Sequence, residues 1–310
     1  MAIVMPEEMD FSNKNITMII YGLPGVGKTT LALSAPDVLL IDCDKGMSRV
    51  NPEHRKASSI CTTYEEVLAD VREAKGKFKS IVIDTCGALI EMLKDWAMRT
   101  EPSTATKKSG GISMQGFGIV KSEFLRFSRE LSDNFNVIYI FHAQKDKTND
   151  DVFYDLICEG SAKNVCWQPA DLGAYAQIIN EERYLGFTPT MNYSAKSAYG
   201  IKGLIKVPEL KEGEPNVFLT NLFKKVRENM KNEQMALKPI NEEYEKVMAE
   251  GTKLVDSIVD AKTANDVRNA LKELPNVSTS GKELQTKFKA KIGELGIVWD
   301  KITQTYVSNV

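Results

Sequence analysis

The chain has 310 residues, of which 43% are hydrophobic, enough for one large core and a smaller second one. Its net charge of −2 excludes a globally basic protein, so any nucleic-acid binding must come from local patches. No apolar run approaches membrane-spanning length and no C-x-x-C pair occurs among five cysteines, which predicts a soluble cytoplasmic protein with reduced thiols and no membrane partner.

The first strong pattern is a glycine-rich turn between a strand and a helix. Residues 16–21 are apolar and β-branched, which predicts a buried strand, and residues 31–33 read as the start of a helix. Between them lies G-x-x-x-x-G-K-T, the phosphate-binding P-loop, in which backbone N–H groups surround an anion, the lysine reaches the β- and γ-phosphates and the threonine hydroxyl binds Mg²⁺. The residues predicted to bind a triphosphate are Gly22, Gly25, Val26, Gly27, Lys28, Thr29 and Thr30.

A second buried strand, residues 38–43 (VLLIDC), ends in two carboxylates, Asp42 and Asp44. Carboxylates at the carboxyl end of a parallel strand face the ligand crevice. Because residues two apart on an extended chain share a face, we expect both to point the same way. One of them is expected to orient or activate the attacking water, and the alternative is that they cap the following turn.

A third buried strand, residues 80–84 (SIVID), follows a helix that Thr63 and Glu66 open with a capping box and that runs to about residue 75. An aspartate at the tip of such a strand, here Asp84, is predicted to hold Mg²⁺ opposite Thr29. The alternative is that this end of the strand caps the helix of residues 88–97.

Residues 100–118 (TEPSTATKKSGGISMQGFG) are rich in Gly, Ser and Thr, which predicts a long loop. Its Lys107 and Lys108 either bind a phosphate backbone or belong to a plain solvated loop. The following helix has an apolar face, and a fourth buried strand occupies residues 137–141. The face is formed by Val120, Phe124, Phe127 and Leu131.

His142 and Gln144 follow that fourth strand. A polar side chain at this position can contact the γ-phosphate and report its presence to the next segment. For His142 a satisfied core histidine is the alternative. Residues 145–151 (KDKTNDD) are charged and suit a mobile loop.

The remaining chain divides into a strand-bearing part and a helical part. Strands are predicted at residues 152–157 and 184–187, and residues 161–179 are expected to be partly helical. The charged, proline-containing segment 206–216 marks a domain edge, so we expect one domain over 1–210 and another over 217–310.

The second domain is expected to contain only helices. Thr263 with Asp266, and Ser280 with Glu283, have the spacing of helix caps. The last helix carries four lysines, which predicts either a solvated face or a surface for an anionic partner such as DNA. They are Lys282, Lys287, Lys289 and Lys291.

The order of these motifs resembles that of the RecA-like ATPase core. LIDCDKG is similar to the segment in which a RecA-type strand ends in Asp-x-Glu and the glutamate activates water, a position held here by Asp44. SIVIDTCGAL resembles the RecA-type Walker B strand, and the hydroxyl residue Thr85 after the aspartate counts against the AAA+ class. The chain also resembles phage-encoded RecA-core proteins, described as phage nucleotide-binding proteins or single-strand annealing recombinases. That family pattern is matched by His142, Arg183, Leu185, Tyr193, Ala195 and Lys196.

The resemblance covers residues 14–205 and implies an α/β fold, with a RecA-like P-loop core around a mainly parallel sheet and a smaller all-helical C-terminal region. It implies Mg²⁺-dependent ATP hydrolysis between subunits of a homo-oligomer, as a filament or a ring. Lys196 would act in trans, with Arg183 or Lys202 as substitutes. Single-stranded DNA would be bound by the two loops, and a single-strand-binding protein is a further candidate partner. The loop lysines are Lys107, Lys108, Lys145 and Lys147.

Two main hypotheses of function follow. The first is an ATPase that binds single-stranded DNA and promotes annealing or strand exchange in phage recombination. The second is a nucleotide-gated switch with negligible turnover, because Asp44 is one methylene shorter than the glutamate of the RecA pattern. A small-molecule kinase is a weaker alternative, since no acceptor site or arginine-rich lid is recognisable. We expect Lys28 to be exposed in the empty site, so that Lys28→Ala would abolish nucleotide binding with little loss of fold.

Overall fold

A computed structural model describes residues 11, 13–148, 151–158 and 162–308, without the side chains of residues 147, 148, 151 and 162–164. The expected N-terminal lead-in therefore lies almost wholly outside the described residues. Contacts divide the chain into two compact units, Phe11–Asn229 and a unit containing Met230–Val310. No helix within the described ranges combines the length and the apolar character that crossing a membrane requires.

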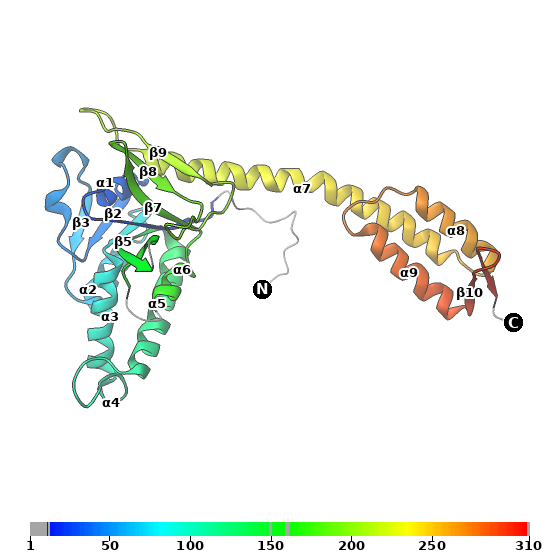
Figure 1. The fold of residues 1–310 in the computed structure, drawn as a ribbon, viewed down its shortest axis with the longest axis horizontal. Helices are drawn as coiled ribbons and strands as arrows, with labels where there is room; N and C mark the ends of the chain where they lie inside the picture. The colour runs from blue at the N-terminus through cyan, green and yellow to red at the C-terminus, as the bar shows by residue number, and fades with distance from the viewer. Residues whose placement is uncertain (1–10, 12, 149–150, 159–161, 309–310) are drawn as a thin grey trace. The chain divides into compact units, whose positions relative to one another are not determined.

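A nine-stranded sheet forms the centre of the first unit, in the order β3-β2-β4-β5-β1-β7-β8-β9, with β6 paired to β5 (Figure 1). The pairs from β3 to β7 are parallel, whereas β8, β9 and β6 pair antiparallel. This confirms the predicted α/β class with a mainly parallel sheet. The strands are β1 (Thr17–Gly22), β2 (Val38–Asp42), β3 (Ala57–Ile60), β4 (Ser80–Asp84), β5 (Asn136–Thr148), β6 (Asp151–Leu156), β7 (Leu172–Ile179), β8 (Glu182–Gly186) and β9 (Leu204–Val207).

Helices cover this sheet. The largest core cluster joins one face of β1, β4 and β5 to the apolar faces of α2, α3 and α5, and the predicted face of α5 is buried within it. The helices of the unit are α1 (Lys28–Ala32), α2 (Tyr64–Ala74), α3 (Cys86–Thr100), α4 (Pro102–Ala105), α5 (Met114–Asn134), α6 (Ala162–Trp167), the start of α7 (Phe218–Asp256), and the 3-10 turns η2 (Met47–Arg49) and η3 (Pro52–His54). The capping box of Thr63 and Glu66 is present at the start of α2.

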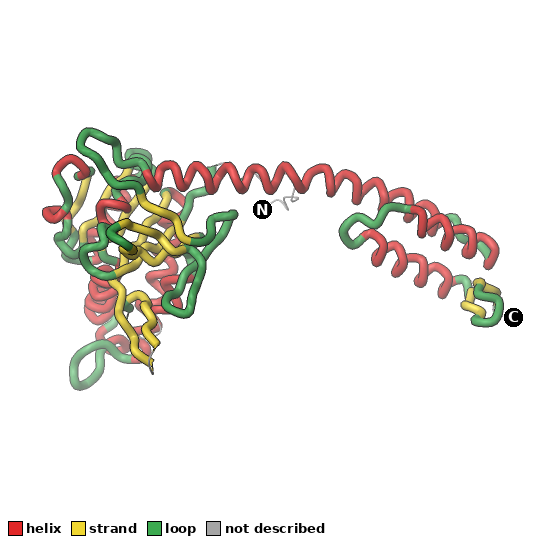
Figure 2. The backbone as a smooth tube through the Cα atoms, turned by 45° about the horizontal axis from the view of Figure 1, so that its top comes forward, coloured by secondary structure: helices red, strands yellow, loops and turns green. Residues whose placement is uncertain are grey.

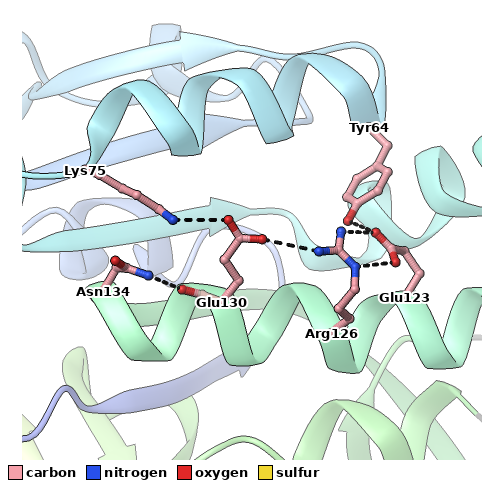
Figure 3. Close-up of polar contacts among 6 residues, drawn as sticks. All are labelled: Tyr64, Lys75, Glu123, Arg126, Glu130 and Asn134. Atoms are coloured by element: carbon pink, nitrogen blue, oxygen red, sulfur yellow. Dashed lines mark hydrogen bonds and ion pairs between the residues drawn. The ribbon is translucent and has the colours of Figure 1, made fainter.

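Polar contacts also join α2 to α5 (Figure 3). The Arg126 guanidinium donates to both carboxylate oxygens of Glu123, at 2.7 and 2.5 Å. The Tyr64 hydroxyl donates to Glu123 at 2.6 Å, and Lys75 pairs with Glu130 at 3.2 Å. Because Tyr64 is fully buried, its hydroxyl depends on Glu123 as a partner. The network fixes how these two helices lie against each other.

Two predicted loops are largely regular structure. The segment 100–118 contains the end of α3, all of α4 and the start of α5, and a turn closed by a Thr106–Ile112 bridge separates α4 from α5. The segment 145–151 belongs to a hairpin of β5 and β6, in which Lys145 pairs with Tyr154 and Lys147 with Val152. Figure 2 draws this hairpin as two neighbouring yellow strands. The expectation of two long mobile loops is therefore wrong for the described residues, because pairing and helix packing override their polar composition.

Strand β7 was also missed, because residues 161–179 were expected to be partly helical. The helical part is only α6, and β7 follows as the parallel neighbour of β1. Its small residues are required by packing, since a Cβ on Gly173 would lie 2.1 Å from the Trp167 ring. Small residues weaken the sequence signal of a strand.

The C-terminal unit is mainly helical, as expected. It contains the later turns of α7 with α8 (Ala261–Glu273) and α9 (Ser280–Glu294). Its core includes Val255, Ile258, Val267, Phe288 and Ile292. A small hairpin that the sequence analysis missed, β10 (Ile297–Asp300) with β11 (Thr305–Ser308), completes the unit.

Both predicted caps in this unit are displaced. Asp260, not Thr263, is the N-cap of α8, and its carboxylate accepts a hydrogen bond from the Thr263 N–H in a reciprocal capping box. Thr279, not Ser280, is the N-cap of α9. In the first case Thr263 serves as the third residue of the box, so its spacing to Asp266 carried no information.

Candidate nucleotide-binding site

The glycine loop leaves β1 and enters α1 in a conformation that requires glycine. Gly25 and Gly27 both have φ of +84°, and Gly27 is the N-cap of α1. Gly22 is needed for a different reason: a Cβ there would lie 2.4 Å from the Ala176 carbonyl oxygen of β7. The loop is thus held between β7 and the N-terminus of α1, with its chain direction set for anion binding.

The Lys28 ammonium folds back over this loop and donates to the carbonyl oxygens of Gly22 and Leu23, each at 2.9 Å. Only 7% of the residue is exposed, so the expectation of a largely exposed lysine is wrong. Burial lowers the Lys28 pKa, although the carboxylates of Asp84 and Asp44 oppose the shift. Substitution of Lys28 therefore removes contacts of the folded loop as well as a phosphate ligand.

Thr29 and Asp84 meet at the tips of α1 and β4. The Thr29 hydroxyl donates to a carboxylate oxygen of Asp84 at 2.6 Å. Asp84 is 5% exposed, and burial raises its pKa, with the nearby carboxylates of Asp44 and Asp42 adding to the shift against the Thr29 hydrogen bond and Lys28. A buried carboxylate with its charge destabilised in this way favours a cation beside it.

Asp42 and Asp44 do not point the same way. Strand β2 ends at Asp42, whose buried carboxylate accepts hydrogen bonds from the N–H groups of Gly46 and Met47 at 2.8 and 3.0 Å. The two-residue alternation stops where the strand ends, so the chain turns before Asp44. Asp42 therefore caps the turn, as the alternative held, and Asp44 alone is left facing the site.

Asp44 lies between two basic side chains. Its Oδ1 accepts a hydrogen bond from Arg49 at 2.7 Å, and its Oδ2 lies 3.7 Å from Nε2 of His142. His142 on β5 is directly opposite Gly22 on β1 in the sheet register, which brings it to the P-loop. Among the described residues, no partner binds its buried Nδ1, so His142 is not the satisfied core histidine of the alternative interpretation.

These elements place a glycine loop, a lysine, a hydroxyl–carboxylate pair and a further carboxylate around one end of a parallel sheet. A family model described as an AAA domain matches residues 14–199, more than half of the chain. The chain belongs to the AAA domain family. No curated protein matches the chain.

Membership of the AAA domain family implies a P-loop ATPase, and nucleotide binding with it. The matched residues include every part of the site described above. The expectation that Thr85 sets the chain apart from the AAA+ class is not supported by this match. In the structure Thr85 is the N-cap of α3, its hydroxyl accepting from the Ala88 N–H at 3.3 Å, which is the structural role that the sequence analysis kept open for this end of the strand.

The AAA domain does not bring every predicted catalytic residue to this site. The Gln144 amide donates to Asp146, two residues along the same strand, at 3.1 Å. Lys196 is half-buried and donates to the Trp167 carbonyl oxygen at 3.2 Å, while its backbone pairs with Gly173. Neither side chain contacts the P-loop within the part of the chain that the structure describes.

Arg183, the substitute for Lys196, lies beside the P-loop of its own chain. Its Nε is 3.3 Å from the position of a Cβ on Gly27. The antiparallel pairing of β7 with β8 places it there, because β7 borders β1. Since the sequence analysis missed β7, it had no means of predicting this proximity.

The predicted DNA-binding lysines of the AAA domain lie away from these carboxylates in the chain and are exposed where described. Lys107 and Lys108 are exposed on the turn between α4 and α5, beside two glycines with positive φ. Lys145 is exposed on β5. The side chain of Lys147 lies outside the described part of the structure.

Thr29 and Asp84 suit magnesium. Mg²⁺ takes oxygen ligands and is commonly held by one or two protein oxygens together with substrate phosphates and water. The hydroxyl and the carboxylate, 2.6 Å apart and directly after the glycine loop, supply such oxygens next to the place where phosphates would lie. The donor set therefore fits the metal.

Proposed function

We propose that this protein binds ATP with Mg²⁺ and hydrolyses it. The observation that carries the proposal is the contact between Thr29 of the glycine loop and Asp84 of β4, made beside a lysine that already bridges the loop carbonyls. A bound Mg²⁺ would neutralise developing charge on the β- and γ-phosphates. Thr29 and Asp84 would hold it.

The residues of the chain have separate tasks in this proposal. Lys28 exchanges its contacts with Gly22 and Leu23 for phosphate oxygens, so its charge stays paired before and after binding. Asp44 accepts a hydrogen bond from the attacking water and polarises it. His142, 3.7 Å from Asp44, orients that carboxylate and lies where it can respond to the γ-phosphate.

Isothermal titration with Mg-ATP tests the site directly. Lys28→Ala is expected to reduce affinity by a hundredfold or more, about 3 kcal/mol or above, because a buried charge-assisted contact is lost. Lys56→Ala, which removes an exposed lysine elsewhere, is the control and should bind as the wild type does. Wild-type affinity in Lys28→Ala would disprove the assignment.

We further propose that ATP turnover is coupled to single-stranded DNA in a cytoplasmic homo-oligomer that serves annealing or strand exchange in phage recombination. Support comes from the RecA-like order of motifs and from the exposed lysines on the α4–α5 turn and the β5–β6 hairpin. Phosphate contacts by such lysines make binding salt-dependent.

The test measures the ATPase rate and DNA affinity with poly-dT at several salt concentrations. Joint reversal of Lys107 and Lys108 to Glu should weaken binding and reduce the salt slope by roughly 2, one unit for each lost phosphate contact. The same reversal at Lys231 and Lys238, two exposed lysines of α7, is the matched control. An unchanged slope in the first variant removes that turn from the DNA site.

A second candidate function is a nucleotide-gated switch with negligible turnover that acts through a protein partner. It is favoured by the Arg49 contact, which ties down the carboxylate of Asp44. In that case Arg49→Ala should raise the single-turnover hydrolysis rate several-fold, since the carboxylate becomes available to water. DNA-stimulated turnover of the wild type would exclude this candidate.

A further inference from the structure

A cavity of about 420 Å³ adjoins the P-loop on the side of β8 and β9. Gly27 and Thr30 of the loop and α1 form part of its lining, and the other walls come from β8, β9, the segment after β9 and the first turns of α7. All of these residues belong to the unit Phe11–Asn229. None of the residues assigned above to phosphate or water chemistry, apart from Gly27 and Thr30, lines it.

We propose that this cavity binds the nucleoside moiety, base and ribose, of the nucleotide whose phosphates occupy the P-loop. The inference rests on the proposed ATP binding and extends it. The nucleoside is bonded to the α-phosphate, so it must lie directly next to the loop. The cavity is the space that shares Gly27 and Thr30 with that loop, and its volume falls within the range of about 300–1,000 Å³ typical of small-molecule sites.

The walls have the chemistry of a base-binding site. Leu185, Val207 and Phe218 supply apolar surface from three different elements, which suits the faces of a flat heteroaromatic ring. Asn216 supplies a carboxamide, whose oxygen can accept from a base or a ribose hydroxyl. Its amide nitrogen donates to the Thr30 carbonyl oxygen at 2.7 Å, so the side chain is held in place.

The wall from α7 is fixed to the P-loop helix by further hydrogen bonds. The Leu219 N–H donates to the Ser34 hydroxyl at 2.9 Å, and the Thr220 hydroxyl donates to the Ser34 carbonyl oxygen at 2.8 Å. Ser34 follows α1 directly. The cavity is therefore a formed feature of the fold, which lowers the ordering cost of binding.

Arg183 stands where the cavity meets the loop. Its guanidinium lies over Gly27, and none of the described residues forms an ion pair or hydrogen bond with it. A cation at this junction is suited to the phosphate nearest the nucleoside. Arg183 thus marks the boundary between the phosphate part and the nucleoside part of one site.

Titration calorimetry with two ligands, Mg-ATP and Mg-tripolyphosphate, tests the inference. Wild-type protein should bind ATP at least tenfold more tightly, because only ATP fills the cavity. Val207→Trp, which places a bulky ring in the cavity, should lose roughly that tenfold for ATP and keep its affinity for tripolyphosphate. Leu204→Trp on the same strand is the matched control, since Leu204 is exposed and lies outside the lining.

The outcomes separate the two levels of the proposal. Equal affinity of the wild type for both ligands would overturn the nucleoside site and leave the phosphate site standing. Failure of both ligands to bind would overturn the proposed function and the inference together. Arg183→Ala should weaken both ligands alike, in contrast to Val207→Trp. If Val207→Trp does not fold, the wild-type comparison decides alone.

Discussion

At the scale of single residues, the site consists of side chains that already have partners. Lys28 is bound to loop carbonyls, Thr29 to Asp84, and Asp44 to Arg49. Each of these contacts is made to a group that a phosphate, a metal ion or a water molecule could replace. The unliganded site is therefore preorganised, and binding exchanges contacts where it would otherwise have to create them.

Asp84 gives a prediction about pH. Its pKa in the fold is raised by burial above the value of about 3.9 for an unfolded aspartate. The stability associated with its protonated form is fully present below the unfolded pKa and is lost as the pH rises through the folded pKa. Asp84→Asn should therefore have a higher Tm than the wild type at pH 7–8, and the difference should shrink toward pH 4.

Thermal unfolding across that pH range, with and without Mg-ATP, provides the measurement. Mg-ATP should reverse the order at neutral pH, because the wild type binds it more tightly. Asp44→Asn is a useful comparison, since the Asp44 side chain is 30% exposed and less subject to burial. A Tm difference independent of pH would contradict the explanation.

Gly22 gives a prediction about packing. Gly22→Ala introduces a Cβ 2.4 Å from the Ala176 carbonyl oxygen, so β1 and β7 must separate. We expect a loss of about 1–3 kcal/mol in the free energy of unfolding, measured by urea denaturation. Gly118→Ala is the control, because that helical glycine has open space and should gain roughly 0.5–1 kcal/mol.

At the scale of elements, how far the sequence predicts the structure depends on whether the signal is local. Strands β1, β2 and β4 and the glycine loop follow from apolar runs and a fixed motif. The divergence of Asp42 from Asp44 was not predictable, since it depends on where β2 ends. Arg183 reaches the loop only through the pairing of β1, β7 and β8, and the Gly and Ala residues that let β7 pack also conceal it as a strand.

The α5 helix yields a stability prediction. Phe127 is fully buried in the core cluster between the sheet and the helices. Phe127→Ala should cost about 3–5 kcal/mol of unfolding free energy, through lost apolar burial and the cavity left behind. Met114→Ala, at an 85% exposed position of the same helix, should change stability by less than about 0.5 kcal/mol. Chemical denaturation of both variants checks this, and similar losses would refute the assigned core.

At the scale of the whole molecule, the helix α7 contributes its first turns to one unit and its last turns to the other. Between them, residues 231–246 have mostly exposed side chains, including Met235, Leu237 and Ile240. Pro239 lies inside the helix and removes one backbone donor. This middle part is held by few packing contacts.

Hydrogen exchange should therefore be faster at residues 231–243 than at residues 219–230 or 247–256, where buried side chains anchor the helix. Pro239→Ala should slow exchange in the middle part, since proline disfavours a helix interior by about 3 kcal/mol. Lys238→Ala, next to it and exposed, is the control and should change exchange little. Uniform protection along α7 would show that the middle is not weakly held.

The continuity of β5 has a consequence for signalling. The strand carries His142, beside the water-activating carboxylate, and Lys145, on the exposed hairpin, without any turn between them. Three residues of extended chain span roughly 10 Å and bend little. A displacement of the imidazole along the strand axis must therefore carry the lysine with it, so information about bound nucleotide can leave the crevice through a stiff rod and needs no hinge.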